Sequence, residues 1–238
     1  MDGQPGAGPV REAPTLQQLS ETVSAAGWRY ILGTLRASVA VRSLAESLEV
    51  ASEVVAELGA EADGHLLIDV RPDRLILTVY DLATARMTWR DTEIALRVSA
   101  LVGDLGLATE PGLDGESRSV QVLEIGIDAL DIPKIRPFWK AVLGYVDEAG
   151  RTGPNDPLVD PHGQQPAIWF QQMDAPRPQR NRIHFDVSVP HDEAERRIKA
   201  AIEAGGHLVS DRRAPAFWVL ADAEGNEACV TTWQGRDG

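Results

Sequence analysis

Apolar residues recur with helical spacing in three stretches of the first half of the chain. Thr15 is placed to cap a first helix whose apolar positions are Leu16, Leu19 and Val23. A longer helix is predicted over about 43–58, followed by Gly59, with an apolar stripe of Leu44, Leu48, Val54, Val55 and Leu58. Thr88 and Asp91 have capping-box spacing and open a third helix, because side chains three residues apart can satisfy each other's backbone N–H groups.

Two strand-like runs lie between the second and third helices. Residues 66–70 and 74–81 are joined by Arg71-Pro72-Asp73, which predicts a hairpin. The second run, RLILTVYD, is long and apolar and lacks the proline or inward charge that protects a free sheet edge. We therefore expect this edge to pair with its copy in a homodimer.

The second half repeats one order of elements. Strands are predicted at 120–128, 167–173 and 182–190, helices at 131–145 and from Asp192 to Gly205-Gly206, and a last hairpin that turns at residues 223–226. Strand, helix and strands, followed by strand, helix and strands again, make a paired β-α-β-β-β unit.

Glycine and proline punctuate the chain twice. Residues 1–14 are expected to form a disordered arm, and residues 109–118 a linker. The chain thus divides into a domain at 15–108 and a domain at 119–238. Both mix helices and strands, so the fold class is α+β, an N-terminal α/β sandwich followed by the paired unit.

Charge and cysteine content narrow the partners. The formal net charge is −13, which disfavours nucleic acids and anionic membrane surfaces, since both need Lys and Arg for neutralisation. Cys229 is the only cysteine, so no internal disulfide forms and a reducing compartment is expected. With no apolar signal core and no membrane-length apolar run, the expected location is the cytoplasm.

Strand alternation gathers polar side chains on the uncovered faces of the C-terminal strands. Glu124 lies on that face of its strand, His184 shares a face with Asp186 and Ser188, and Glu227 shares one with Cys229. Together with Gln171 they could hold a divalent metal. The non-functional alternative is that polar residues are expected on the solvent-exposed face of any sheet with one buried face, and that Cys229 packs as a small buried residue.

Three separated motifs in this half resemble one family. ALDIPKIRPFWKAVLGY, NRIHFDV and DAEGNEACV are similar to the first helix, second-module strand and last hairpin of the vicinal oxygen chelate superfamily, the glyoxalase and bleomycin-resistance group. The resemblance covers about residues 119–234. It implies a concave sheet with a small-molecule pocket.

The resemblance also implies site residues. The superfamily's four metal-ligand positions fall at Glu124, Gln171, His184 and Cys229, with Glu227 as a substitute for the last. Metal-using members mostly have His and Glu there, so Glu124, His184 and Glu227 are the implied metal and catalytic residues, and zinc is the metal most tolerant of this set. Chelation of two substrate oxygens would then be the chemistry.

Metal-free members of the superfamily bind ligands in the same cavity. In that reading Trp169, Trp218, Gln171 and Cys229 line the pocket, and His184 and Glu124 orient the ligand. The plain alternative for the tryptophans is core packing.

The N-terminal half resembles pterin-4-alpha-carbinolamine dehydratase in the order and spacing of its elements over about residues 15–105. His65 and Asp91 match two of that family's site positions, and Asp81 stands where the family has a histidine. Because the second histidine and the proline after His65 are replaced by leucines, the resemblance implies a degenerate site with a binding or oligomerisation role.

The sequence thus supports a glyoxalase-like protein that binds or transforms a small oxygenated metabolite, with lyase or isomerase-type chemistry. The alternatives are a ligand-sequestering protein and an active 4a-hydroxytetrahydrobiopterin dehydratase.

Overall fold

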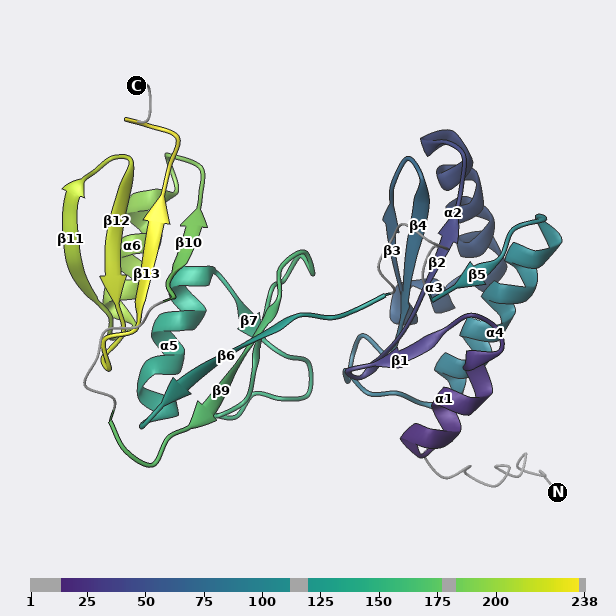
Figure 1. The fold of residues 1–238 in the computed structure, drawn as a ribbon, viewed down its shortest axis with the longest axis horizontal. Helices are drawn as coiled ribbons and strands as arrows, with labels where there is room; N and C mark the ends of the chain where they lie inside the picture. The colour runs from purple at the N-terminus through teal and green to yellow at the C-terminus, as the bar shows by residue number, and fades with distance from the viewer. Residues whose placement is uncertain (1–13, 112–119, 177–182, 236–238) are drawn as a thin grey trace, which may run out of the picture. The chain divides into compact units, whose positions relative to one another are not determined.

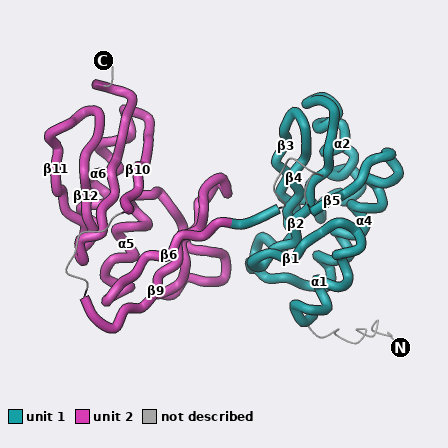
Figure 2. Tube along the Cα trace, viewed as in Figure 1, with its two compact units in different colours: residues 1–122 teal, residues 123–238 magenta. Residues whose placement is uncertain are grey.

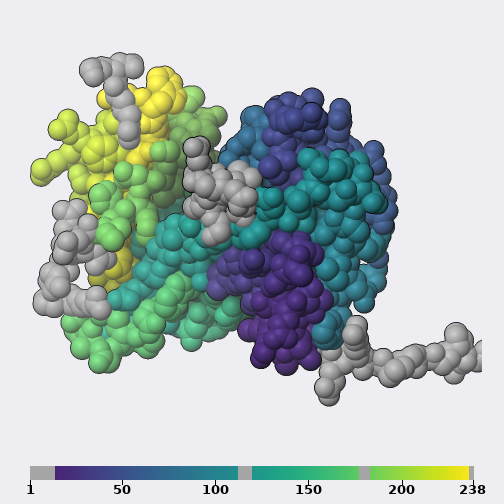
Figure 3. All heavy atoms as spheres, turned by 45° about the vertical axis from the view of Figure 1, so that its right-hand side comes forward, coloured from purple at the N-terminus to yellow at the C-terminus, as the bar shows by residue number. Residues whose placement is uncertain are grey.

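The computed structural model describes residues 14–111, 120–176 and 183–235, which divide into two compact units, residues 1–122 and 123–238 (Figures 1 and 2). In the space-filling view the described residues of each unit pack closely (Figure 3). Among the described helices, none has the length and apolar content that a membrane crossing requires.

An antiparallel sheet and four helices make up the first unit. The strands are β1 (Arg29–Ile31), β2 (Thr34–Ala40), β3 (Leu66–Val70), β4 (Arg74–Val79) and β5 (Thr109–Glu110), in the order β1-β2-β4-β3 with β5 also paired to β2. The helices are α1 (Leu16–Ser24), α2 (Leu44–Leu58), α3 (Glu61–His65) and α4 (Trp89–Asp104). Trp28 is fully buried in the core between the helices and the sheet.

The structure contradicts the expected free edge. β4 pairs with β2 on one side and β3 on the other, so residues 74–79 of the run RLILTVYD lie inside the sheet. The sequence reading missed β2, whose alternation of buried Leu35, Ala37 and Val39 includes a small residue that weakens the apolar signal. β4 therefore has no free edge through which a homodimer could pair.

Helix starts in this unit follow the predicted capping, but one apolar stripe does not. Thr15 caps α1 and Ser43 caps α2, while Gly59 follows α2 with a positive φ of 56°. The predicted stripe of α2 is wrong at Leu44, Leu48 and Val55, which are exposed. The buried face instead consists of Ser47, Val50, Val54 and Leu58.

The predicted linker begins later than expected. Thr109 and Glu110 belong to β5, where they pair with Val39 and Ser38 of β2. Residues 112–118 of the linker and 1–13 of the expected arm lie outside the described residues.

The second unit has the doubled β-α-β-β-β topology. Its first module comprises β6 (Glu124–Ala129), α5 (Ile132–Leu143), β7 (Val146–Asp147), β8 (Leu158–Val159) and β9 (Ala167–Gln172). Its second comprises β10 (Phe185–Ser188), α6 (Ala194–Glu203), β11 (His207–Arg213), β12 (Phe217–Ala221) and β13 (Glu227–Thr231). In each sheet the first strand runs parallel to the fourth, in the orders β6-β9-β8-β7 and β10-β13-β12-β11.

Two elements of this unit begin later than the sequence predicts, the strand expected at 120–128 and the helix expected from Asp192. Leu123 precedes β6 and is exposed, so the apolar face begins at Ile125. Glu193, not Asp192, is the N-cap residue of α6, and its side chain makes no capping hydrogen bond.

The two modules share one hydrophobic core, and the β12–β13 hairpin of the second module hydrogen-bonds to the first. The carboxylate of Asp222, fully buried, accepts hydrogen bonds from the indole N–H of Trp139 (3.0 Å), the backbone N–H groups of Glu224 and Asn226 (2.9 Å each) and the Asn226 side-chain amide (2.8 Å). The Glu224 carboxylate accepts from the backbone N–H groups of Leu130 and Asp131, where α5 begins. The hairpin thus fixes β13 relative to α5.

Ion pairs connect α5 to the sheet of its own module. Asp147 of β7 lies 2.6 Å from Lys140 and 2.6 Å from Arg136, both on α5. These two cations, Lys140 first, hold the pKa of the Asp147 carboxyl below its ordinary value.

Candidate functional site

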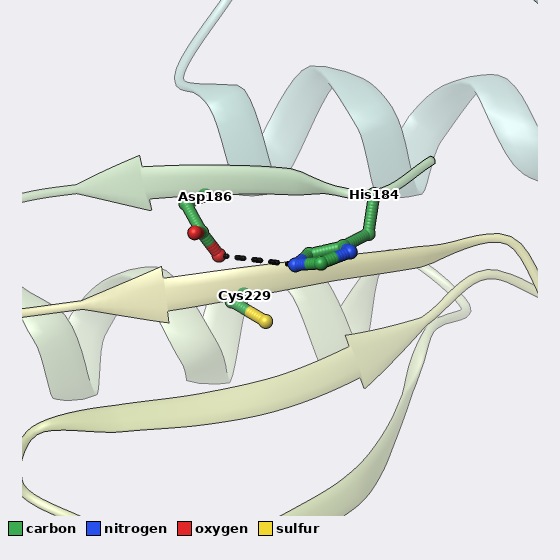
Figure 4. Close-up of side chains that lie close together, drawn as sticks. All are labelled: His184, Asp186 and Cys229. Atoms are coloured by element: carbon green, nitrogen blue, oxygen red, sulfur yellow. Dashed lines mark ion pairs between the residues drawn. The ribbon is translucent and has the colours of Figure 1, made fainter. Parts of the chain in front are cut away.

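Three side chains with metal-binding chemistry meet on one face of the second module's sheet. Asp186 on β10 lies directly beside Cys229 on β13, because these parallel strands pair in that register. His184 comes two residues before Asp186 and so shares its face, with Nε2 3.6 Å from the Asp186 carboxylate (Figure 4). The imidazole nitrogen, carboxylate oxygen and thiol sulfur all lie within 4.8 Å of one another.

The group combines a buried thiol with two accessible polar groups. Cys229 is 7% exposed, whereas the side chains of His184 and Asp186 are 53% and 64% exposed. Further along the same two strands, the hydroxyls of Ser188 and Thr231 hydrogen-bond at 2.8 Å and hold the register. A ligand or ion can therefore reach the group from solvent while the sulfur stays fixed in the sheet.

The donor set suits a borderline metal better than a hard one. Zinc takes nitrogen, sulfur and carboxylate oxygen together, and a tetrahedral set at its usual bond lengths spaces the donors roughly 3.3–3.8 Å apart. The observed spacing is within about one ångström of that. Manganese and magnesium favour oxygen donors, so a thiol in the set disfavours them.

Glu124 does not join this group. It begins β6 in the other sheet, and its charged neighbours are Glu148 and Arg151 of the same module. Burial, followed by repulsion from Glu148 and opposed by Arg151, raises the pKa of the Glu124 carboxyl.

An aromatic side chain lies on the same face of the first module's sheet as Glu124. Trp169 of β9 pairs beside Gly126 of β6, and a Cβ added at Gly126 would meet the indole at 3.0 Å. Trp169 is 38% exposed. Gln171 follows on the same face beside Asp128 and is exposed.

The remaining predicted residues separate from the group. Glu227 shares the face of Cys229, two residues earlier on β13, but its carboxylate lies outside the close group. Trp218 is on the opposite face, because it pairs with Val230 while Val219 pairs with Cys229. The sequence reading placed Trp218 in the pocket with Trp169, and the strand register puts it on the α6 side instead.

Asp186 is the member of the group that the sequence reading did not assign as a ligand. Its spacing of two residues from His184 on a strand is the signal that could have found it. The family positions drew attention to Glu124 and Glu227 instead, which the structure leaves outside the group.

A second polar constellation lies in the first unit. The carboxylate of Asp91, fully buried, accepts from the backbone N–H and hydroxyl of Thr88 and lies 2.8 Å from Nδ1 of His65. Asp81 lies two residues after the end of β4, and its carboxylate accepts from the backbone N–H groups of Ala83 and Thr84. His65 and Asp91, the two residues matched to dehydratase site positions, are thus in contact, and their role stays a prediction.

A comparison with known protein families matches the C-terminal unit. Residues 124–231 match the glyoxalase-like domain family. The glyoxalase-like domain therefore spans both modules, and the resemblance expected for the C-terminal half is confirmed. The dehydratase-like character of the N-terminal unit stays a prediction.

Solved structures similar to this chain carry related names. A glyoxalase/bleomycin resistance protein/dioxygenase family enzyme from Burkholderia phytofirmans PsJN is 17% identical, covering 46% of this chain and 95% of its own, with a TM-score of 0.38. The fosfomycin resistance protein FosX from Mesorhizobium loti is 9% identical, covering 50% and 92%, with a TM-score of 0.38. A manganese complex of FosX from Listeria monocytogenes is 13% identical, covering 47% and 90%, with a TM-score of 0.37. The search of curated proteins found no match.

Proposed function

We propose that the glyoxalase-like domain binds a small oxygenated organic molecule at His184, Asp186 and Cys229, and acts on it as a lyase or isomerase-type enzyme of the cytoplasm. The observation that carries the proposal is the convergence of the three donor atoms within 4.8 Å on a solvent-accessible sheet face. Polar groups so placed on a rigid sheet are suited to orienting a ligand.

The residues present fit a zinc-class ion at this position. A divalent ion held by His184, Asp186 and Cys229 would supply Lewis-acid polarisation of two neighbouring substrate oxygens. The Asp186 carboxylate lies 3.6 Å from Nε2 of His184, which is a spacing that two donors to one ion can adopt. Glu227, on the same face, is the carboxylate placed to exchange a proton with a ligand bound there.

Ligand sequestration without chemistry is the alternative for the same face. The exposure of His184 and Asp186 favours it, since an open pair holds an ion less firmly than an enclosed one. Dehydratase activity of the first unit is a third candidate, supported by the His65–Asp91 contact.

Titration with acetohydroxamate distinguishes the first two readings, because this probe offers two adjacent oxygens. We expect calorimetry on the full chain to show binding with one equivalent of Zn²⁺ and none without it. His184→Ala and Cys229→Ala should abolish binding, and His162→Ala, in the first module, should leave it unchanged. Binding that does not need Zn²⁺ would favour sequestration over metal-assisted chemistry, and no binding under either condition would contradict the proposed site.

A further inference from the structure

A groove with a volume of about 480 Å³ lies between α6 and the strands β11 and β12. Its apolar lining consists of Ile198, Ile202, Leu208 and Trp218. Ile202 and Leu208 are each 42% exposed, so the apolar surface is open to solvent. The groove is on the α6 side of the sheet, opposite Cys229, because Trp218 pairs with Val230 and Cys229 with Val219.

Acidic side chains also line this groove. Glu195, Glu203 and Asp211 line the groove, and Lys199 is the one cation among its lining residues. The Lys199 ammonium lies 3.8 Å from Glu203, which leaves the groove with an excess of negative charge. The chain as a whole carries a net charge of −13, which strengthens the attraction for a cation.

The neighbouring edge strand is poorly suited to pairing with another strand. β11 pairs with β12 alone among the described strands, but its register shifts between Leu208 and Ser210 and again between Ser210 and Arg213. Such bulges and the charges of residues 211–213 are devices that prevent edge pairing. The groove volume lies within the range of about 300–1,000 Å³ typical of small-molecule sites.

We propose that this groove binds a small organic cation, an apolar body with an ammonium group, packed on the indole of Trp218. The apolar floor accepts the body of the ligand, and the carboxylates of Glu195 and Asp211 at the rim attract its charge. The face of an indole also attracts a cation through its ring quadrupole. The site lies on a different face from the one in the proposed function and does not depend on it.

Three matched probes test the charge preference: phenethylammonium, phenethyl alcohol and 3-phenylpropionate, each titrated into the ¹⁵N-labelled full chain. We expect amide shifts confined to α6, β11 and β12, with the ammonium binding roughly 2- to 30-fold more tightly than the alcohol. The carboxylate should bind most weakly. Equal affinities for the ammonium and the alcohol, or shifts located elsewhere, would overturn the proposal.

Variants separate the charge from the floor. The double variant Glu195→Gln, Asp211→Asn changes only rim residues, and it should reduce ammonium affinity toward that of the alcohol while leaving alcohol binding unchanged. Trp218→Leu should weaken the ammonium most, and Trp233→Leu, an exposed tryptophan outside the groove, should have no effect. If light scattering shows self-association and concentration-dependent shifts map to the groove, a second copy occupies it and the proposal fails.

Discussion

Removing the carboxylate of Asp222 tests what holds the two modules of the glyoxalase-like domain together. Asp222→Ala leaves the indole N–H of Trp139 without an acceptor, and Trp139 is 1% exposed, so water cannot replace the lost bond. It also removes the acceptor of two backbone N–H groups in the hairpin. A buried donor left unsatisfied costs about 1–3 kcal/mol, and breaking a buried charged network costs about 3–5 kcal/mol in all.

Calorimetry on the full chain measures this loss. For a unit of this size, about 3–5 kcal/mol corresponds to a fall in Tm of roughly 12–20 °C in the transition of the C-terminal unit. Asp222→Asn keeps a carbonyl for the backbone N–H groups but turns an NH₂ toward Trp139, so we expect an intermediate loss. Asp211→Ala, at an exposed position on β11, is the control. A loss below about 1 kcal/mol in Asp222→Ala would refute the reasoning.

Three further predictions concern other parts of the chain. Gly126→Ala should displace the Trp169 indole, whose ring lies 3.0 Å from the added Cβ, and shift its fluorescence, measured against Trp169→Phe; an unchanged spectrum would argue against the contact. The lowered pKa of Asp147 stabilises the fold at pH values above the unfolded pKa of about 4, and this stabilisation is lost as the pH falls through the lower folded pKa. Asp147→Asn should therefore make stability depend less on pH below about pH 4. A pH dependence of unfolding unchanged from that of the unsubstituted chain would contradict this. The first unit should show no carbinolamine dehydration, and acceleration that His65→Ala abolishes would show otherwise; Asp81→His restores one family position for comparison.

The elements that the sequence predicted well are those with strong local signals. Thr15, Ser43 and Thr88 begin helices because their side chains satisfy backbone N–H groups, and Gly144 ends α5 with a left-handed φ of 71°. β2 and β11 were missed because their apolar alternation is interrupted by small or charged residues. β2 is defined by its pairing with β4 and β5, which are distant in sequence, and β11 by an irregular pairing with its neighbour β12.

The candidate site was predictable only in part for the same reason. His184 followed from the motif and Cys229 from the hairpin, but the approach of Cys229 to His184 and Asp186 depends on the parallel register of β10 and β13. Trp218 was misplaced because its face is set by pairing with Val230, which no local pattern in its own strand reveals. Register between distant strands is a property of the whole fold.

The most direct test of the proposed site is an absorption titration of the reduced full chain with Co²⁺, which substitutes for zinc and reports thiolate ligation. We also expect the purified protein to hold less than one equivalent of divalent metal, because His184 and Asp186 are open to solvent. The account predicts a thiolate-to-cobalt charge-transfer band on titration that is lost in Cys229→Ser and His184→Ala, weakened in Asp186→Asn, and kept in Glu124→Gln. Absence of the band at saturating Co²⁺, or its persistence in Cys229→Ser, would contradict a metal-binding centre at these residues.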